Sequence, residues 1–205
     1  MPGRFFLTTP MAELGAALGC DPCVVADEAP RQNVAPGQEI VVLTEKGLSR
    51  MRWGIIPVGR VNARGRPVME TLVNARSETV FDKSAYLGTG RAVVPMNGWY
   101  EWTGEKRRKT AWSITPKSGG FLLFAAITDR WSGPGGVQVD QVATLTCAPS
   151  ADVADVHHRM GVILEPGDVS KWFNGSEEEV LPLLKPWPDG RLQVSPATNV
   201  DWDGP

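Results

Sequence analysis

Short apolar runs, separated by turns, dominate the pattern of hydrophobic and polar positions along this chain. The runs end at Gly, Pro, Asn or Asp, as strands of β-rich proteins do. Runs that predict strands lie at 1–7, 40–43, 48–57, 91–102, 111–115, 121–128, 139–147 and 162–164. Their uneven mixture with a few short helices predicts the α+β class, a β-rich fold with a central antiparallel or barrel-like sheet.

Helical spacing of apolar positions is limited to short stretches. Thr9 and Pro10 predict the start of a helix that ends near Leu18, with Thr9 as its N-cap. Further short helices are predicted at 77–87, 150–155, 168–173 and 176–185. Loops or turns are predicted at 20–37, 58–72 and 74–76.

The length and composition fit one domain. With 205 residues, 42% of them hydrophobic and 21% charged, the chain has enough apolar surface for a core. We expect a single domain over 1–205, with a Pro-rich extension at 186–205 that closes on it. No apolar run suits a membrane span and no signal-peptide pattern is visible, so a cytoplasmic monomer without membrane contact is expected.

Charge and cysteine content narrow the candidate chemistry. The net charge of −2 gives no general attraction to polyanions, so nucleic-acid binding would depend on local basic clusters at 60–66 and 106–109. Each cluster taken singly also fits a solvated turn. The Cys20 and Cys23 pair lacks a second ligand pair for zinc and a βαβ context for redox chemistry, which favours chance spacing of free thiols. No metal and no cofactor is expected.

Histidine and one glutamate are the candidates for proton transfer. His157 and His158 are the only histidines, although a packed or surface role also fits them. Glu101 lies in a Trp-Tyr-Glu-Trp strand, where it shares one face with Trp99. Burial among aromatic rings would raise the pKa of Glu101 and suit it to general acid–base catalysis. An edge-strand carboxylate that faces water is the alternative.

Asn74, Arg76 and the tryptophans are candidates for binding. The Asn74 amide could hold a hydroxyl or a carbonyl, and the Arg76 guanidinium could hold a phosphate. A turn asparagine and a solvated arginine fit the same pattern. The eight tryptophans could stack on bases, although most of them fit a core better.

Several stretches, in order along nearly the whole chain, resemble the SOS-response-associated peptidase (SRAP) family. They lie at 3–5, 33–36, 53–57, 74–79, 94–102, 146, 157–160 and 194–199. Any one of them is weak, whereas the ordered set is specific. The resemblance implies a SRAP-like fold and the shielding of abasic sites in single-stranded DNA by covalent crosslinking, without a cofactor.

The resemblance also implies roles for particular residues. In that family the initiator methionine is removed, and a cysteine at position 2 traps the ring-opened sugar aldehyde as a thiazolidine. Glu101 would handle protons during ring opening, His157 would be the active-site histidine, and Asn74 would position the first residue and the sugar. DNA contacts, with the arginines holding phosphates, are implied for Gly3, Arg4, Asn33, Trp53, Arg76, Thr146 and Arg159.

The chain departs from the family pattern at position 2, where Pro2 replaces the cysteine. No thiazolidine can form without a thiol, but a proline exposed by loss of Met1 is a secondary amine and still a nucleophile. Its attack gives an iminium, which favours β-elimination of the 3′ phosphate or hydrolysis over a stable trap. Smaller departures are Val58-Gly59, where an aromatic residue is common, and Gly161, where proline is usual.

Three functions remain open after the residues have been weighed. In the first, the Pro2 amine attacks the aldehyde with help from Glu101 and His157, as an abasic-site lyase or a transient crosslinker that joins the nucleoid when bound to DNA. The second is a non-catalytic sensor of abasic or single-stranded DNA. The third is the peptidase of the family name, for which the sequence places neither a cysteine at position 2 nor a serine near His157.

Overall fold

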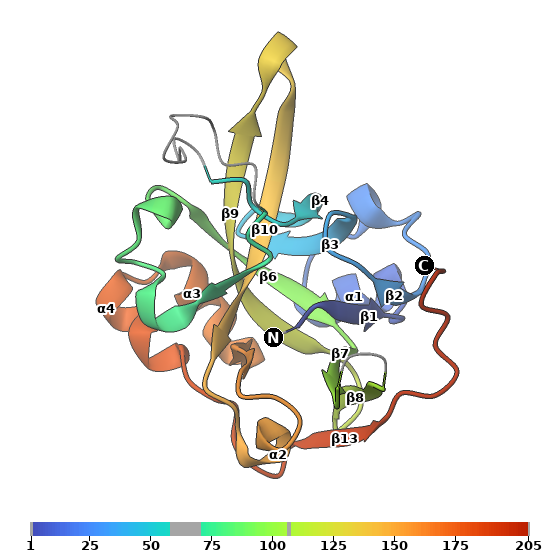
Figure 1. Ribbon diagram of the computed structural model, residues 1–205. Coiled ribbons are helices and arrows are strands. Elements are labelled where there is room, and N and C mark those ends of the chain that lie inside the picture. Colours follow the sequence, from blue (N-terminus) through green and yellow to red (C-terminus); the bar gives the residue numbers. More distant parts are fainter. Residues whose placement is uncertain (1, 58–70, 106–107, 205) are drawn as a thin grey trace.

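The computed structural model describes residues 2–57, 71–105 and 108–204. The predicted basic cluster at 60–66 and the Val58-Gly59 departure lie outside these residues, as does half of the cluster at 106–109. Within them, the chain forms two sheets with short helices at the periphery (Figure 1).

The larger sheet closes into a barrel. Its strands follow the order β11-β10-β4-β3-β6-β9-β12, and the additional pairing of β9 with β10 completes a ring of five strands. This ring confirms the predicted barrel-like sheet. The ring strands are β3 (Glu39–Thr44), β4 (Gly47–Trp53), β6 (Gly90–Met96), β9 (Leu122–Ser132) and β10 (Gln138–Cys147); the others are β5 (Asn74–Arg76), β11 (Met160–Gly161) and β12 (Ile163–Leu164).

The smaller sheet lies beside the barrel and carries the start of the chain. Its order is β13-β8-β7-β1-β2, with every pairing antiparallel. A short turn at Asn97 joins β6 of the larger sheet directly to β7 of the smaller sheet. The two sheets therefore share a continuous stretch of chain. The strands are β1 (Arg4–Leu7), β2 (Arg31–Val34), β7 (Gly98–Thr103), β8 (Thr110–Pro116) and β13 (Leu192–Pro196).

Several predicted elements differ from the structure. The segment 74–76 is a strand, β5, because it pairs in parallel with β10, and the predicted loop at 20–37 contains β2. Thr9 is not an N-cap, since the first helix has Pro10 at that position and no side-chain cap. Gly161, where proline is usual in the family, lies in strand β11. A Cβ at this position would lie 2.0 Å from the Phe124 ring.

The helices are short and lie outside the barrel (Figure 1). The predicted helix at 176–185 ends early: a capping box of Ser176 and Glu179 begins it, and a 3₁₀ turn with proline follows. In the described parts of the chain no helix is long and apolar enough to cross a membrane. The α-helices are α1 (Met11–Leu18), α2 (Ala151–Ala154), α3 (Val169–Asn174) and α4 (Glu177–Val180).

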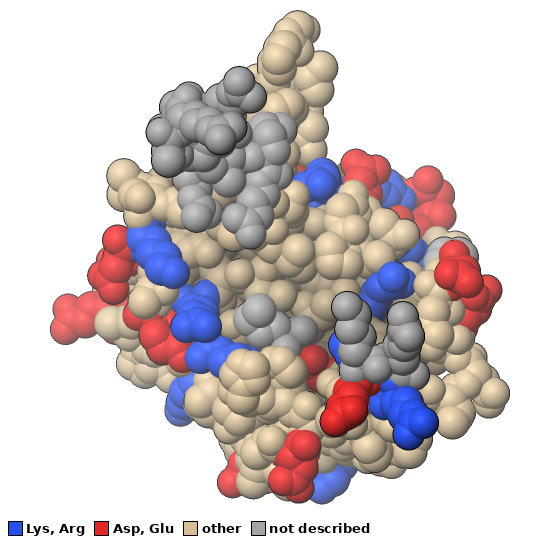
Figure 2. All heavy atoms as spheres, in the orientation of Figure 1, with Lys and Arg blue, Asp and Glu red and all other residues tan. Residues whose placement is uncertain are grey.

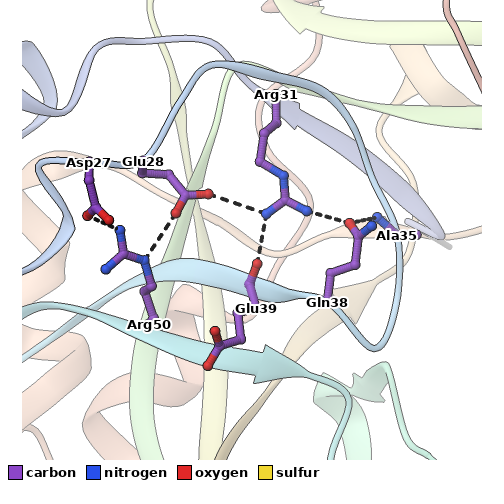
Figure 3. A network of polar contacts seen from close by, with 7 residues as sticks. All are labelled: Asp27, Glu28, Arg31, Ala35, Gln38, Glu39 and Arg50. Atoms are coloured by element: carbon purple, nitrogen blue, oxygen red, sulfur yellow. Dashed lines mark hydrogen bonds and ion pairs between the residues drawn. The ribbon is translucent and has the colours of Figure 1, made fainter. Parts of the chain in front are cut away.

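A polar network joins the two sheets at one side of the molecule (Figure 3). Arg31 on β2 contacts Glu28, the Glu39 carbonyl and the Gln38 side chain, which in turn accepts from a backbone N–H. Arg50 on β4 bonds the same Glu28 at 3.1 Å. Because Glu28 is shared, the loop that precedes β2 is held to the barrel by charge-assisted bonds.

Trp53 belongs to the core, which corrects its predicted role in DNA contact. Its side chain is 0% exposed, its ring meets Phe5 edge-to-face at 5.1 Å, and its indole N–H donates to the Val73 carbonyl. A fully enclosed indole has no free face on which a base could stack. Trp53 instead joins the first strand to the barrel.

Trp53→Ala is therefore expected to lower the free energy of unfolding by about 3–5 kcal/mol, because it opens a cavity at the contact between the sheets. Urea denaturation measures this change. Leu87→Ala is the matched control: Leu87 is 85% exposed, so its change should stay within about 0.5 kcal/mol. Equal effects of the two variants would contradict the core assignment of Trp53.

Candidate active site

The first residues of the chain lie where the two sheets meet. The antiparallel register of β1 with β7 pairs Arg4 with Tyr100 and Phe5 with Trp99, so the chain before Arg4 runs toward Glu101. In Figure 1, β1 starts near the centre of the face toward the viewer. Pro2 is buried, and its carbonyl accepts a 2.9 Å hydrogen bond from Asn74 Nδ2.

Asn74 is oriented by the barrel. The parallel pairing of β5 with β10 places Asn74 opposite Thr144, whose hydroxyl lies 2.5 Å from Asn74 Oδ1. The Pro2 carbonyl can only accept, so the amide must turn its Nδ2 toward Pro2. The Thr144 hydroxyl then donates to Oδ1, which satisfies both ends of the amide and holds the second residue of the chain in place.

Glu101 is a buried carboxyl on β7, with 3% of its surface exposed. β7 lies between β1 and β8, so the alternative of a water-facing edge carboxylate is wrong. Burial raises the pKa of Glu101 because it penalises the anion. The predicted direction of this pKa shift is confirmed.

His157 is half-buried just after α2. Its Nδ1 lies 2.9 Å from the Arg159 backbone nitrogen, from which it can accept, and 3.0 Å from the Arg159 carbonyl oxygen, to which it can donate in the other tautomer. Burial lowers the pKa of His157, opposed in part by the Arg159 backbone. The ring stacks on His158 at 4.4 Å. The imidazole is thus biased toward its neutral form.

Arg159 is held by an ion pair that sequence reasoning missed. Its guanidinium bonds both carboxylate oxygens of Glu78, at 2.5 and 2.8 Å, and the Thr146 carbonyl at 2.5 Å. This hydrogen bonding lowers the pKa of Glu78. Thr146 is 0% exposed and contacts Arg159 and the Ala75 carbonyl, so it supports the arginine rather than lining an open surface.

Arg4 and Asn33 form a second polar pair, on the smaller sheet. Arg4 Nη1 donates to Asn33 Oδ1 at 2.6 Å. Asn33 is 1% exposed because residues of the C-terminal segment lie against it, and its Nδ2 donates to the carbonyls of Asp201 and Gly204. The predicted DNA contacts at Arg4 and Asn33 are thus occupied by the chain itself.

The structure brings most of the predicted residues to one face. Pro2 meets Asn74 directly, β5 and β10 bring Arg76 beside Thr146, and Arg159 joins this group. Arg76 is exposed. Figure 2 shows basic side chains on both flanks of the face toward the viewer, interspersed with acidic ones, around a mainly uncharged centre. Trp53 stays apart in the core, and no group of three or more possible metal ligands occurs in the described residues.

Thr144 and Glu78 were not predicted as members of the site. Thr144 reads in the sequence as one more small residue of an apolar strand, and only its register with Asn74 shows its role. Glu78 stands two residues after Arg76, where it resembles a solvated helix-start carboxylate. The one available signal was its place in the 74–79 stretch.

Known proteins resemble this chain along almost all of its length. A profile of the family described as SOS response associated peptidase (SRAP) matches residues 1–200. The chain belongs to this family. This match confirms the family membership that the ordered motifs predicted. This SRAP chain has the asparagine, glutamate and histidine on which the resemblance rested, but it has Pro2 at the second position.

Named relatives come from bacteria and animals. The chain is 29% identical over 199 residues to abasic site processing protein YoqW of Bacillus subtilis, covering 91% of this chain and 88% of the relative. Abasic site processing protein YobE of the same organism is 30% identical, covering 85% and 82%. Abasic site processing protein HMCES of Mus musculus is 30% identical, but the match covers only 52% of that longer protein.

Solved structures confirm the fold. A protein from Bacteroides thetaiotaomicron superposes with a TM-score of 0.81 at 22% identity, covering 96% of this chain and 92% of that one. A protein from Bordetella bronchiseptica gives a TM-score of 0.77 at 20% identity, covering 96% and 99%. The β-rich, barrel-like architecture of this SRAP chain is therefore shared by proteins of low sequence identity.

Glu101→Gln is expected to raise the free energy of unfolding above that of the wild type by more at pH 7 than at pH 4. At pH below the unfolded-state pKa of about 4.3, Glu101 is protonated in both states and contributes no pH dependence. As pH rises, the unfolded state ionises first because the folded pKa is raised, so the wild type loses stability through that window while the glutamine variant does not.

Urea denaturation of both proteins at pH 4 and pH 7 measures this difference. Glu105→Gln serves as the matched control, since Glu105 is exposed just beyond β7. The gap between wild type and Glu101→Gln should widen toward pH 7, whereas the control gap should not. A gap that stays constant or narrows would show that burial of Glu101 does not destabilise its anion.

Proposed function

We propose that this protein processes abasic sites in single-stranded DNA, with the Pro2 nitrogen as nucleophile after Met1 has been removed. The observation that carries the proposal is the hydrogen bond from Asn74, which holds Pro2 at the junction of the sheets. Relatives named abasic site processing proteins support the substrate class. The exposed Arg76 supports a nucleic-acid strand as the partner, because a guanidinium can hold a backbone phosphate.

The proposed reaction begins on the ring-opened sugar. The lone pair of the Pro2 secondary amine attacks the C1′ aldehyde carbon, and the N–H proton leaves the nitrogen as the carbonyl oxygen takes up a proton, which gives a neutral carbinolamine. Loss of the hydroxyl as water, with the C–O bond broken and the nitrogen lone pair forming C=N, yields an iminium. Glu101, whose raised pKa favours the protonated form, supplies the proton that makes water the leaving group.

His157 takes a complementary part in this scheme. In the tautomer in which Nδ1 accepts from the Arg159 N–H, the ring carries its proton on Nε2 and donates from there in this scheme. Such a donor can stabilise negative charge on the sugar oxygen during ring opening and attack. A lowered pKa keeps the ring neutral, so it does not add a positive charge next to the amine that must remain unprotonated.

The iminium has two exits. Removal of a C2′ proton allows the C3′–O bond to break and the 3′ phosphate to leave, which is strand cleavage by β-elimination. Addition of water instead returns the aldehyde and the free amine. Neither exit leaves a stable adduct, because Pro2 lacks the thiol that would close a thiazolidine ring. We therefore propose a lyase or a transient crosslink rather than a permanent one.

A sensor without covalent chemistry is the second candidate. It is favoured by the replacement of the expected nucleophilic cysteine and by the exposed Arg76. A sensor would bind abasic single-stranded DNA with a salt-dependent affinity that Glu101→Gln leaves unchanged. The peptidase suggested by the family name gains no support from the site, since no cysteine or serine among the described contacts of His157 could act as nucleophile.

Borohydride trapping tests the amine chemistry. Intact mass first establishes that Met1 is absent, and the protein is then mixed with abasic single-stranded DNA with or without borohydride. We expect an adduct only with borohydride, because reduction converts the transient iminium into a stable tertiary amine. Glu101→Gln should slow trapping by about 10²–10⁴-fold, the usual loss when a general acid is removed.

Pro2→Cys is the matched variant. It restores an adjacent amine and thiol, so its adduct should form and survive without borohydride. If Pro2→Cys crosslinks to DNA while the wild type without Met1 gives no adduct with borohydride, the proposed location of the site is supported but the proposed proline chemistry is wrong. If neither variant gives an adduct, the proposed site itself is wrong.

A further inference from the structure

The C-terminal segment at 198–204, called the strap here, lies over the smaller sheet. In Figure 1 it runs from the end of β13 back to the edge formed by β1 and β2. β13 itself is held by its ladder with β8, and the last bond of this kind joins the Ala197 N–H to the Ala111 carbonyl. Beyond that point, the strap has no strand or helix assignment.

Polar contacts of the strap end on two residues expected to meet DNA. Arg4 Nη1 donates to the Trp202 carbonyl at 3.3 Å. Asn33 Nδ2 donates to the carbonyls of Asp201 and Gly204, each at 2.9 Å. Every acceptor is a main-chain oxygen, and the donors are the kinds of group that bind phosphate oxygens.

An aromatic contact fixes the middle of the strap. The Trp202 ring meets Tyr100 edge-to-face at 5.0 Å and Trp102 at 5.3 Å with an interplanar angle of 56°. Tyr100 and Trp102 lie on the outer face of β7, opposite the face that carries Glu101 and Trp99. A flat ring of the strap therefore covers aromatic side chains that could receive a nucleobase.

The charge of the strap completes the likeness to a nucleotide. Asp201 and Asp203 are exposed, so the strap adds negative charge beside Arg4. Acceptor oxygens, anionic groups and one flat ring are also what a nucleotide of a single strand presents. We propose that the strap is a built-in occupant of a nucleotide subsite on Arg4, Asn33 and Trp102, and that single-stranded DNA must displace it.

This inference rests on the proposed function, since it needs DNA to approach β1. Its energetic basis is simple competition. The measured dissociation constant equals the intrinsic constant divided by the fraction of molecules in which the strap is open. Because the strap is held by a few contacts outside any ladder, it can open without unfolding the sheet.

Trp202→Ala tests the strap in the full-length chain. We expect undamaged single-stranded DNA of mixed sequence to bind about tenfold more tightly, as for a closed fraction of about 90%. Trp187→Ala is the matched control: Trp187 also lies in the C-terminal region, but its described contacts are with Glu165 and Arg191, which lie outside the strap. Its affinity should change less than twofold on the same scale.

Equal or weaker binding by Trp202→Ala would overturn the inference. A chain that ends at Ala197 gives a second measurement, because it keeps β13 and should bind as tightly as Trp202→Ala. A peptide of residues 198–204, added to that shortened chain, should compete with DNA; a peptide without effect contradicts the subsite.

The outcomes also separate this inference from the proposed function. If the wild type forms the trapped adduct with abasic DNA but the strap variants bind DNA with unchanged affinity, only the strap inference is wrong. Absence of DNA binding in every variant contradicts both proposals.

Discussion

The hydrogen bond between the Asn74 amide and the Pro2 carbonyl is the constraint on which the candidate site depends. Chain ends without such a bond are normally poorly ordered. Asn74 can hold Pro2 because the Thr144 hydroxyl takes its other end, and Thr144 belongs to β10 in the closed barrel. The position of the second residue is therefore set by a strand far away in the sequence, not by its own neighbours.

Burial gives the site an unusual electrostatic character. Glu101 and His157 are both shifted toward neutral forms, one by a raised and the other by a lowered pKa. A secondary amine beside an ionised carboxylate would be stabilised as ammonium and lose its lone pair. Neutral neighbours remove that stabilisation. The same desolvation thus serves both the acid and the nucleophile of the proposed reaction.

Local patterns predicted the fold class and that Glu101 and Trp99 share one face of β7, because strand alternation is a property of adjacent residues; whether that face was buried stayed open until the structure. They failed where long-range pairing decides. The segment 74–76 looked like a turn, yet it is a strand whose partner stands 70 residues later. Trp53 was expected at the DNA, yet it is in the core, since an aromatic residue alone does not reveal which side it faces. The ion pair between Glu78 and Arg159 could likewise not be predicted from the sequence, because the two residues are 81 positions apart.

That last contact changes what Arg159 can offer to a ligand. Its guanidinium is already neutralised by a bidentate carboxylate and a backbone carbonyl. A phosphate arriving there would replace Glu78 rather than fill an empty position, so the net gain would be the difference between two similar anions. Any anion that binds Arg159 must therefore displace the Glu78 carboxylate, whose charge also interacts with Arg76.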